Sequence, residues 1–289
     1  MTAPAEALPA IAAAGRWHRL RRNPAVIFGL ALLAAVIAGA LLAPLLFTVD
    51  PVALNPAVRL RAPSAALWFG SDMYGRDIYS RSIYGARVSL AVGLCVAALG
   101  VAIGLAIGLV AGYLRWVDAV VMRIMDGLMA IPGVLLAIAL VALAGASLSS
   151  VVIAITVPEI PRVVRLVRSV VLGIREEPYV EAAIALGTRV PKILLRHILP
   201  NTLAPLIVHG TYVCASAIIT EAILSFLGAG IPPEIPSWGN IMAEGRIYFQ
   251  IAPWIIFFPG LLLALTVLAV NILGDGLRDT LDPKLARRL

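Results

Sequence analysis

The sequence predicts an all-α, polytopic membrane protein with six transmembrane helices. Of its 289 residues, 61% are hydrophobic and only 13% are charged, whereas soluble domains are about half apolar and about a quarter charged. Apolar stretches recur along the chain, and each is long enough as a helix to cross ~30 Å of hydrocarbon. A helical bundle that crosses a bilayer several times is therefore the expected architecture.

The fourth of the six apolar segments is the weakest, because Glu159 and two prolines interrupt it. It must continue to Val167 to cross, with Glu159 shielded by protein or by an arginine. In the third segment we expect Pro132 to introduce a kink, and Arg123 to pair with Asp126 within one helical turn. The predicted spans are 25–47, 88–112, 119–145, 148–167, 206–227 and 253–273.

Two features of the first two spans complete this assignment. The first span follows a basic segment, as in a signal peptide, but its apolar run is too long for a signal-peptide core of 7–15 residues, so we expect a retained span. The second span carries a glycine at every fourth position, which lets a neighbouring helix approach closely, and packing is favoured over pore lining. These glycines are Gly100, Gly104, Gly108 and Gly112.

Lysine and arginine counts favour six spans with both termini in the cytosol. That arrangement places 17 of these residues inside and 6 outside, in accordance with the positive-inside rule. Five spans with the N-terminus outside would place 16 of these residues inside and 7 outside. The four arginines before the first span favour the arrangement with six spans. The main exception is the first outer loop, whose five arginines are Arg59, Arg61, Arg76, Arg81 and Arg87.

Several function classes are excluded by the same composition. The net charge of +7 is no sign of nucleic-acid binding, because cytosolic loops of membrane proteins are rich in Lys and Arg. The three histidines are scattered, so no metal site is expected. Both lysines follow a proline, which excludes the Gly-Lys-Ser/Thr end of a phosphate-binding loop. We find no catalytic constellation either, so an enzyme is not expected.

Residues 177–201 form a polar stretch between long apolar segments, and we expect two short helices beside the membrane. Pro178 suits a first helical turn. Gly187 can take the left-handed conformation that closes the first helix, and Thr188 can cap the second. Pro200 is expected to end that second helix.

This stretch resembles the EAA loop of permease subunits from ATP-binding-cassette (ABC) importers. The pattern is E-A-A, three residues, G, nine residues, I, one residue, L-P, and His197 stands at the family's Ile position. In that family the hairpin is the coupling helix, which docks in a cleft of the ATPase subunit. The alternative is an amphipathic loop that packs on its own protein. The matching residues are Glu181, Ala182, Ala183, Gly187, Leu199 and Pro200.

Further motifs resemble the C-type (second) permease of dipeptide, oligopeptide and nickel importers. They are Arg22-Asn23-Pro24, the series from Gly70-Ser71-Asp72 to Gly85-Ala86-Arg87-Val88-Ser89-Leu90, Glu221-Ala-Ile-Leu-Ser-Phe-Leu-Gly228, Ser237-Trp238-Gly239, Pro253-Trp254, and the end from Gly274-Asp275-Gly276 to Leu281-Asp282-Pro283. The sequence departs at Val157-Pro158-Glu159, where the family has Trp.

Two of these motifs have structural alternatives. The 70–90 series either folds the outer loop onto the second span or contacts a solute-binding protein. The glycine-rich end is expected to stop the sixth helix, with Gly274 as the break and Asp275 as the next cap.

The resemblance implies a type I ABC importer permease fold. It divides the chain into a tail, first helix and loop at 1–85, a permease core at 86–275 and a C-terminal tail at 276–289. It also implies half of a translocation pore in the bacterial inner membrane, with a B-type permease, two ABC ATPases and an extracytoplasmic solute-binding protein as partners. No cofactor is expected in this chain, because the ATPases bind ATP and Mg. Peptides are the first expected solute, with glutathione or nickel chelates as alternatives.

The rival from another class is an ion-coupled secondary transporter. It needs several acidic groups or broken helices at mid-membrane, and Glu221 and Glu159 are the candidates. Glu221 lies among apolar residues, so it should face the bundle interior. There it either lines the translocation path or pairs with an Arg or Asn on another helix. The two readings stay open at this point.

Overall fold

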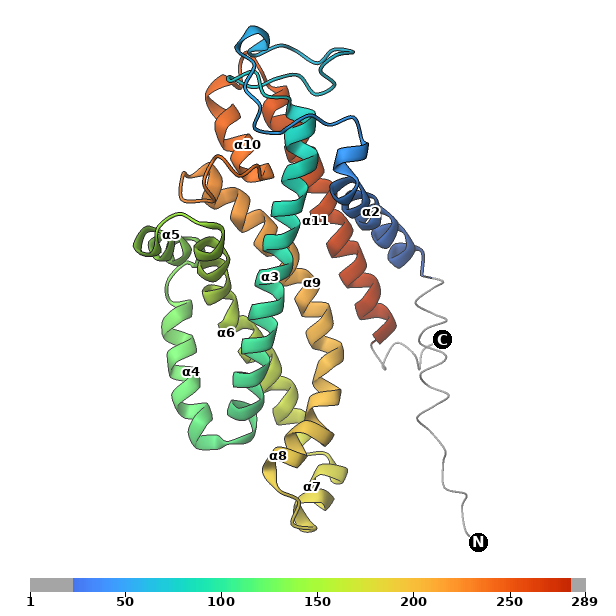
Figure 1. Cartoon of the computed structure of the whole chain (residues 1–289). Coiled ribbons are helices and arrows are strands. Elements are labelled where there is room, and N and C mark those ends of the chain that lie inside the picture. The colour runs from blue at the N-terminus through green and yellow to red at the C-terminus, as the bar shows by residue number, and fades with distance from the viewer. Residues whose placement is uncertain (1–22, 282–289) are drawn as a thin grey trace.

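The computed structural model describes residues 23–281, and this part of the chain is helical without a β-strand (Figure 1). The all-α prediction is confirmed. The basic residues of 1–22 and the Asp282-Pro283 pair lie outside the described residues. The elements are α2 (Pro24–Leu41), η1 (Ala43–Leu45), η2 (Pro56–Val58), α3 (Ile78–Tyr113), α4 (Arg115–Met129), α5 (Gly133–Ala144), α6 (Leu148–Arg175), α7 (Pro178–Ala185), α8 (Val190–Ile193), η3 (Leu194–Ile198), α9 (Leu199–Phe226), α10 (Trp238–Gly245), η4 (Arg246–Tyr248) and α11 (Trp254–Leu281).

Four helical segments of the described chain are long and apolar enough to cross a membrane: α2, α3, the run from α8 to α9, and α11. A fifth span results if α4 and α5 count as one, although they are bent by 87° at the break. The expected kink lies there, since Pro132 is the N-cap residue of α5. The remaining expected span corresponds to α6, which continues as one helix through both of its prolines. It is not among the helices apolar enough to cross a membrane, so the predicted number of six spans is not confirmed.

The α3–α6 contact is a ladder of glycines against valines. A Cβ atom added to Gly104, Gly108 or Gly112 would lie 2.5–2.7 Å from the Cβ of a valine on α6, far inside normal contact. The stripe therefore packs against a helix, as predicted, because only hydrogen side chains permit this spacing. The facing valines are Val163, Val167 and Val171, all buried in the main apolar core that α3, α6 and α9 share.

The prediction for Arg123 and Asp126 is wrong. Asp126 pairs instead with Arg165 of α6, and Asp118 accepts from both Nε and Nη2 of Arg168 on the same helix. Helix α4 buries only Met125, and both ion pairs join it to the neighbouring helix α6.

The expectation that Gly274 ends the last helix is also wrong, because α11 continues to Leu281. A Cβ on Gly274 would collide with Thr211 of α9, and one on Gly276 would collide with Val26 of α2. The two glycines thus open two faces of one helix for close approach. Gly29 completes the α2–α11 crossing, since its Cβ would lie 2.9 Å from the Leu273 backbone nitrogen.

The connection between α2 and α3 is shorter than predicted, because α3 begins ten residues before Val88. Asp77 caps the helix by accepting from the Ser80 backbone nitrogen at 2.9 Å. Arg76 and Arg81 are buried, and both pair with Asp72 and with Glu244 of α10. The loop is therefore folded onto α3 and α10 by a buried ion cluster.

Arg87 fulfils a different role at the end of α2. Its guanidinium donates to the backbone oxygens of Ala40 and Leu41, at 2.6 and 3.2 Å, and so satisfies carbonyls that a helix end leaves free. Three of the five arginines that break the positive-inside pattern are thus engaged within the fold. Their charge is used for structure at this end of the bundle.

Candidate functional site

The polar hairpin α7–α8 projects from one end of the bundle, beyond the turn between α3 and α4 and far from α10 (Figure 1). Val180 and Ile193 are buried and anchor its two short helices. Pro178 occupies the first turn of α7, as predicted. The hairpin is therefore packed against the rest of the protein through apolar contacts.

Gly187 closes α7 as the sequence predicts. Its φ is +73°, and its backbone nitrogen donates to the Ile184 oxygen at 2.9 Å while Thr188 donates to Ala183 at 3.0 Å. These two bonds define a Schellman motif. Apart from its chain neighbours, no atom of residues 23–281 lies within 4 Å of a Cβ added at Gly187, so it is the left-handed backbone and not a lack of space that favours glycine there.

Two other local predictions for the hairpin are wrong. The N-cap of α8 is Arg189 without a side-chain bond, so Thr188 does not cap that helix. Pro200 does not end the second helix, because the π-helical turn η3 leads directly into α9. In this turn the Leu199 backbone nitrogen donates to the Leu194 oxygen, five residues back. The shifted pattern lets Pro200, which has no N–H, sit in the first turn of α9.

The structure brings the six motif residues to this hairpin and exposes most of them. Glu181, Ala182, Gly187 and Pro200 are exposed, Leu199 is half-buried, and Ala183 is buried against the protein. Glu181 forms no ion pair with any residue in 23–281.

Sequence reasoning missed the apolar tip of the hairpin. Leu186 is 85% exposed, and Ile184 and Tyr179 are about half exposed beside it. The signal was available, since three large apolar residues stand in a polar segment. Burial and the negative charge of Glu177 raise the pKa of Tyr179, which stays a neutral hydroxyl and accepts from Asn201 at 3.3 Å. An exposed apolar tip of this kind is typical of a protein–protein contact.

Glu221 is fully buried where α9 meets α10. One carboxylate oxygen accepts from the hydroxyls of Ser225 and Ser237, at 2.9 and 2.8 Å. Ser237 is also the N-cap residue of α10, so the negative charge lies near a helix N-terminus, where it is favoured. No Arg or Asn of the described chain bonds to this carboxylate.

Glu159 lies on α6 opposite Gly100 and is 5% exposed. Arg162, one turn later, donates to it at 2.6 Å, so protein and an arginine both shield it. The structure keeps Glu159 and Glu221 apart as two separate polar spots, each with its own neighbours. They do not form one acidic cluster.

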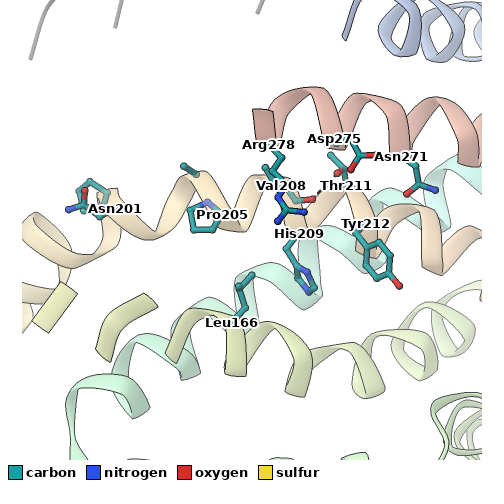
Figure 2. Close-up of a pocket in the computed structure, with 13 residues that line it drawn as sticks. Leu166, Asn201, Pro205, Val208, His209, Thr211, Tyr212, Asn271, Asp275 and Arg278 are labelled. Atoms are coloured by element: carbon teal, nitrogen blue, oxygen red, sulfur yellow. Dashed lines mark hydrogen bonds between the residues drawn. The ribbon is translucent and has the colours of Figure 1, made fainter. Parts of the chain in front are cut away.

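A pocket of about 720 Å³ opens between α9, α11 and Leu166 of α6 (Figure 2). His209 points from α9 toward α6, while Asp275 and Arg278 come from α11 (Figure 2). From the sequence we expected Asp275 to cap a helix, and that expectation gave no indication that the residue lines a pocket. Other polar residues of the wall are Asn201, Thr211, Tyr212 and Asn271.

Several helices that are long and apolar enough to cross a membrane, with a polar hairpin projecting from one end (Figure 1), define the class of a multi-span membrane protein. Residues 100–287 match the family described as binding-protein-dependent transport system inner membrane component, and residues 14–63 match the N-terminal TM domain of oligopeptide transport permease C. The chain belongs to this family of ABC importer permeases.

Relatives along nearly the whole chain agree with this placement. A probable peptide ABC transporter permease of Sinorhizobium fredii is 55% identical over 93% of this chain and 92% of its own. The dipeptide transport system permease of Alkalihalophilus pseudofirmus is 45% identical over 93% and 89%. A glutathione transport system permease of Pectobacterium atrosepticum is 45% identical over 93% and 90%.

One solved structure shows the same fold. The inward-facing MetNI methionine ABC transporter aligns with a TM-score of 0.53 and 22% identity, over 69% of this chain and 95% of that one. The predicted type I importer permease fold is therefore confirmed at the level of architecture.

Proposed function

We propose that this chain forms half of the translocation pore of a di- or oligopeptide importer and is moved by a separate ATPase. The observation that carries the proposal is the projecting hairpin with its exposed tip at Leu186. Such a tip has no partner within residues 23–281, and it lies in the segment that matches the coupling loop. Relatives named for peptide and dipeptide transport support the solute class.

Among the six motif residues, the exposed ones would contact the ATPase and the buried ones would anchor the hairpin. Glu181 offers a free carboxylate to a cation of the ATPase, and Ala182 lets the two backbones approach closely. Gly187 sets the angle of the hairpin, while buried Ala183 and half-buried Leu199 join it to the bundle. Pro200 starts α9, so force on the hairpin passes directly into a membrane helix.

The proposed assembly contains a B-type permease, two ABC ATPases that bind ATP and Mg, and an extracytoplasmic solute-binding protein. This chain needs no cofactor and catalyses no reaction of its own. We place both termini in the cytosol and count six spans, with α4–α5 as the third and α6 as the fourth. The domain limits follow as 1–85, 86–275 and 276–289.

The 720 Å³ pocket would be part of the solute path in this half-pore. Its polar wall, with Asp275 and Arg278 on one helix, would be costly against lipid but suits a water-filled passage. Glu221, by contrast, we assign to an intramembrane network, because serines of α9 and α10 surround it. Glu159, paired with Arg162 of the same helix, would stabilise the contact between α3 and α6.

Uptake into proteoliposomes tests the proposal. With all partners present, labelled dipeptide should accumulate only with ATP and binding protein, and Leu186→Asp should reduce ATPase binding and uptake about tenfold. Ile247→Asp is the matched control, since Ile247 is 76% exposed at the other end of the chain's bundle. Uptake without any ATPase subunit would refute the proposal.

Glutathione is the second candidate solute, because one relative at 45% identity carries that name. Competition between labelled dipeptide and glutathione in the same vesicles decides between the two.

A further inference from the structure

A second, smaller cavity of about 250 Å³ lies where the chain leaves α2 and approaches α3. Its wall combines aromatic rings with one carboxylate, and neither the coupling hairpin nor the proposed solute path includes it. The lining residues are Phe47, Val49, Ala66, Leu67, Trp68, Asp77 and Tyr79.

Three aromatic rings of this wall lie next to one another. The ring centroids of Trp68 and Tyr79 are 4.8 Å apart, and those of Phe47 and Trp68 are 6.5 Å apart. The Tyr79 hydroxyl donates to the Leu46 backbone oxygen at 3.0 Å, which locks that ring in place. The faces of such rings attract a cation, such as an ammonium group, and tryptophan does so most strongly.

Asp77 adds a negative charge that the fold uses only in part. Its Oδ2 accepts from the backbone nitrogen and the hydroxyl of Ser80, at 2.9 and 2.5 Å. Its Oδ1 accepts no hydrogen bond from the described residues, and no Lys or Arg among them pairs with Asp77. A carboxylate beside aromatic rings thus faces the cavity without a countercharge.

The rim of the cavity is continuous with the apolar surface of a membrane-spanning helix. Leu41, the last residue of α2, and Leu45 of η1 are 68% and 75% exposed, and Phe47 follows with 88%. Phe47 has a φ of +55°, which is rare for an aromatic residue. Exposure of this phenyl ring to water does not offset the backbone strain. Contact with the lipid interface, where aromatic side chains are enriched, does offset it.

We propose that this cavity binds the ammonium group of a phosphatidylethanolamine headgroup. The aminoethyl group has three heavy atoms and needs about 90 Å³ at the ~30 Å³ that a water takes up, so the cavity accommodates it. The primary ammonium donates to Asp77 Oδ1 and lies against the rings of Trp68 and Tyr79. A quaternary choline has no N–H to donate, and the carboxylate repels a headgroup that carries only negative charge. With the proposed orientation, the lipid belongs to the outer leaflet.

Asp77→Asn is the discriminating variant, because asparagine still caps a helix while the charge is lost. The complete transporter is reconstituted in equal amounts of phosphatidylethanolamine and phosphatidylglycerol, re-extracted in mild detergent and weighed with its retained lipids by native mass spectrometry. We expect retained phosphatidylethanolamine in the wild type and an about tenfold loss of its preference in Asp77→Asn and Trp68→Leu. Trp116→Leu, at an exposed tryptophan of α4, should retain the preference.

Equal retention of both lipids by the wild type, or unchanged preference in Asp77→Asn, would overturn the proposal. Displacement of the lipid by soluble dipeptide or phosphoethanolamine would assign the cavity to an aqueous amine instead, and would overturn the lipid assignment as well. Thermal unfolding of each variant confirms that the fold is intact. The readout is lipid mass, so it is independent of whether the transporter carries peptides.

Discussion

Replacing Gly108 of α3 by alanine tests the packing on which the bundle depends. The added Cβ would lie 2.7 Å from the Val167 Cβ, so the helices must separate by about 0.7 Å to restore an ordinary contact of 3.4 Å. Overpacking of this kind costs about 1–3 kcal/mol, whereas alanine in a helix gains about 1 kcal/mol over glycine. The clash outweighs the propensity, and we expect Gly108→Ala to lower the thermal unfolding midpoint of the purified complex.

Gly127 of α4 supplies the matched control, because its added Cβ has no neighbouring atom within 4 Å in the described part of the chain. Gly127→Ala should leave the midpoint unchanged or raise it. Val167→Gly removes both side-chain atoms that clash, the Cβ at 2.7 Å and the Cγ1 at 2.9 Å, so the double variant with Gly108→Ala should be more stable than the sum of the two single effects by about 1 kcal/mol. Additive effects, or Gly108→Ala as stable as Gly127→Ala, would show that the glycine–valine ladder does not set the helix spacing.

Three further predictions concern single sites. Gly187→Asn should preserve ATPase binding, since asparagine tolerates a left-handed backbone, while Gly187→Pro should abolish it; equal binding by both variants in a pull-down speaks against the role of the Schellman turn. Glu221→Gln should leave uptake intact and cost about 1–3 kcal/mol of stability, and lost uptake at unchanged stability would place Glu221 in the solute path instead. Glu244→Ala leaves Arg76 and Arg81 with one less buried partner and should cost about 3–5 kcal/mol; a loss below about 1 kcal/mol in thermal unfolding would contradict the buried ion cluster.

The coupling hairpin illustrates which features of the site are local. The Gly187 turn could be predicted because its conformation depends only on neighbouring residues, from Ala183 to Thr188. The bend at Pro132 and the glycine stripe of α3 follow from the missing N–H and the missing Cβ of single residues. The exposed tip at Leu186 could have been predicted in the same way, from an apolar residue in a polar segment.

Partner choice was decided only by the tertiary structure. Asp126 has Arg123 nearby in sequence, yet it pairs with Arg165, because the packing of α4 on α6 places that arginine opposite it. Gly274 appears to be a helix stop until Thr211 of another helix is seen to occupy the space of its Cβ.

Sequence by itself determined that this chain is a helical membrane bundle with a glycine-closed polar hairpin, since periodicity, apolar length and backbone conformation are properties of neighbouring residues. Tertiary structure alone decided where the charges go. Arg76, Arg81 and Arg87 count as exceptions when loop charges are summed, but the fold engages them with two carboxylates and the free end of α2. Ion pairs and helix caps between distant segments depend on distance in space, which no count along the chain contains.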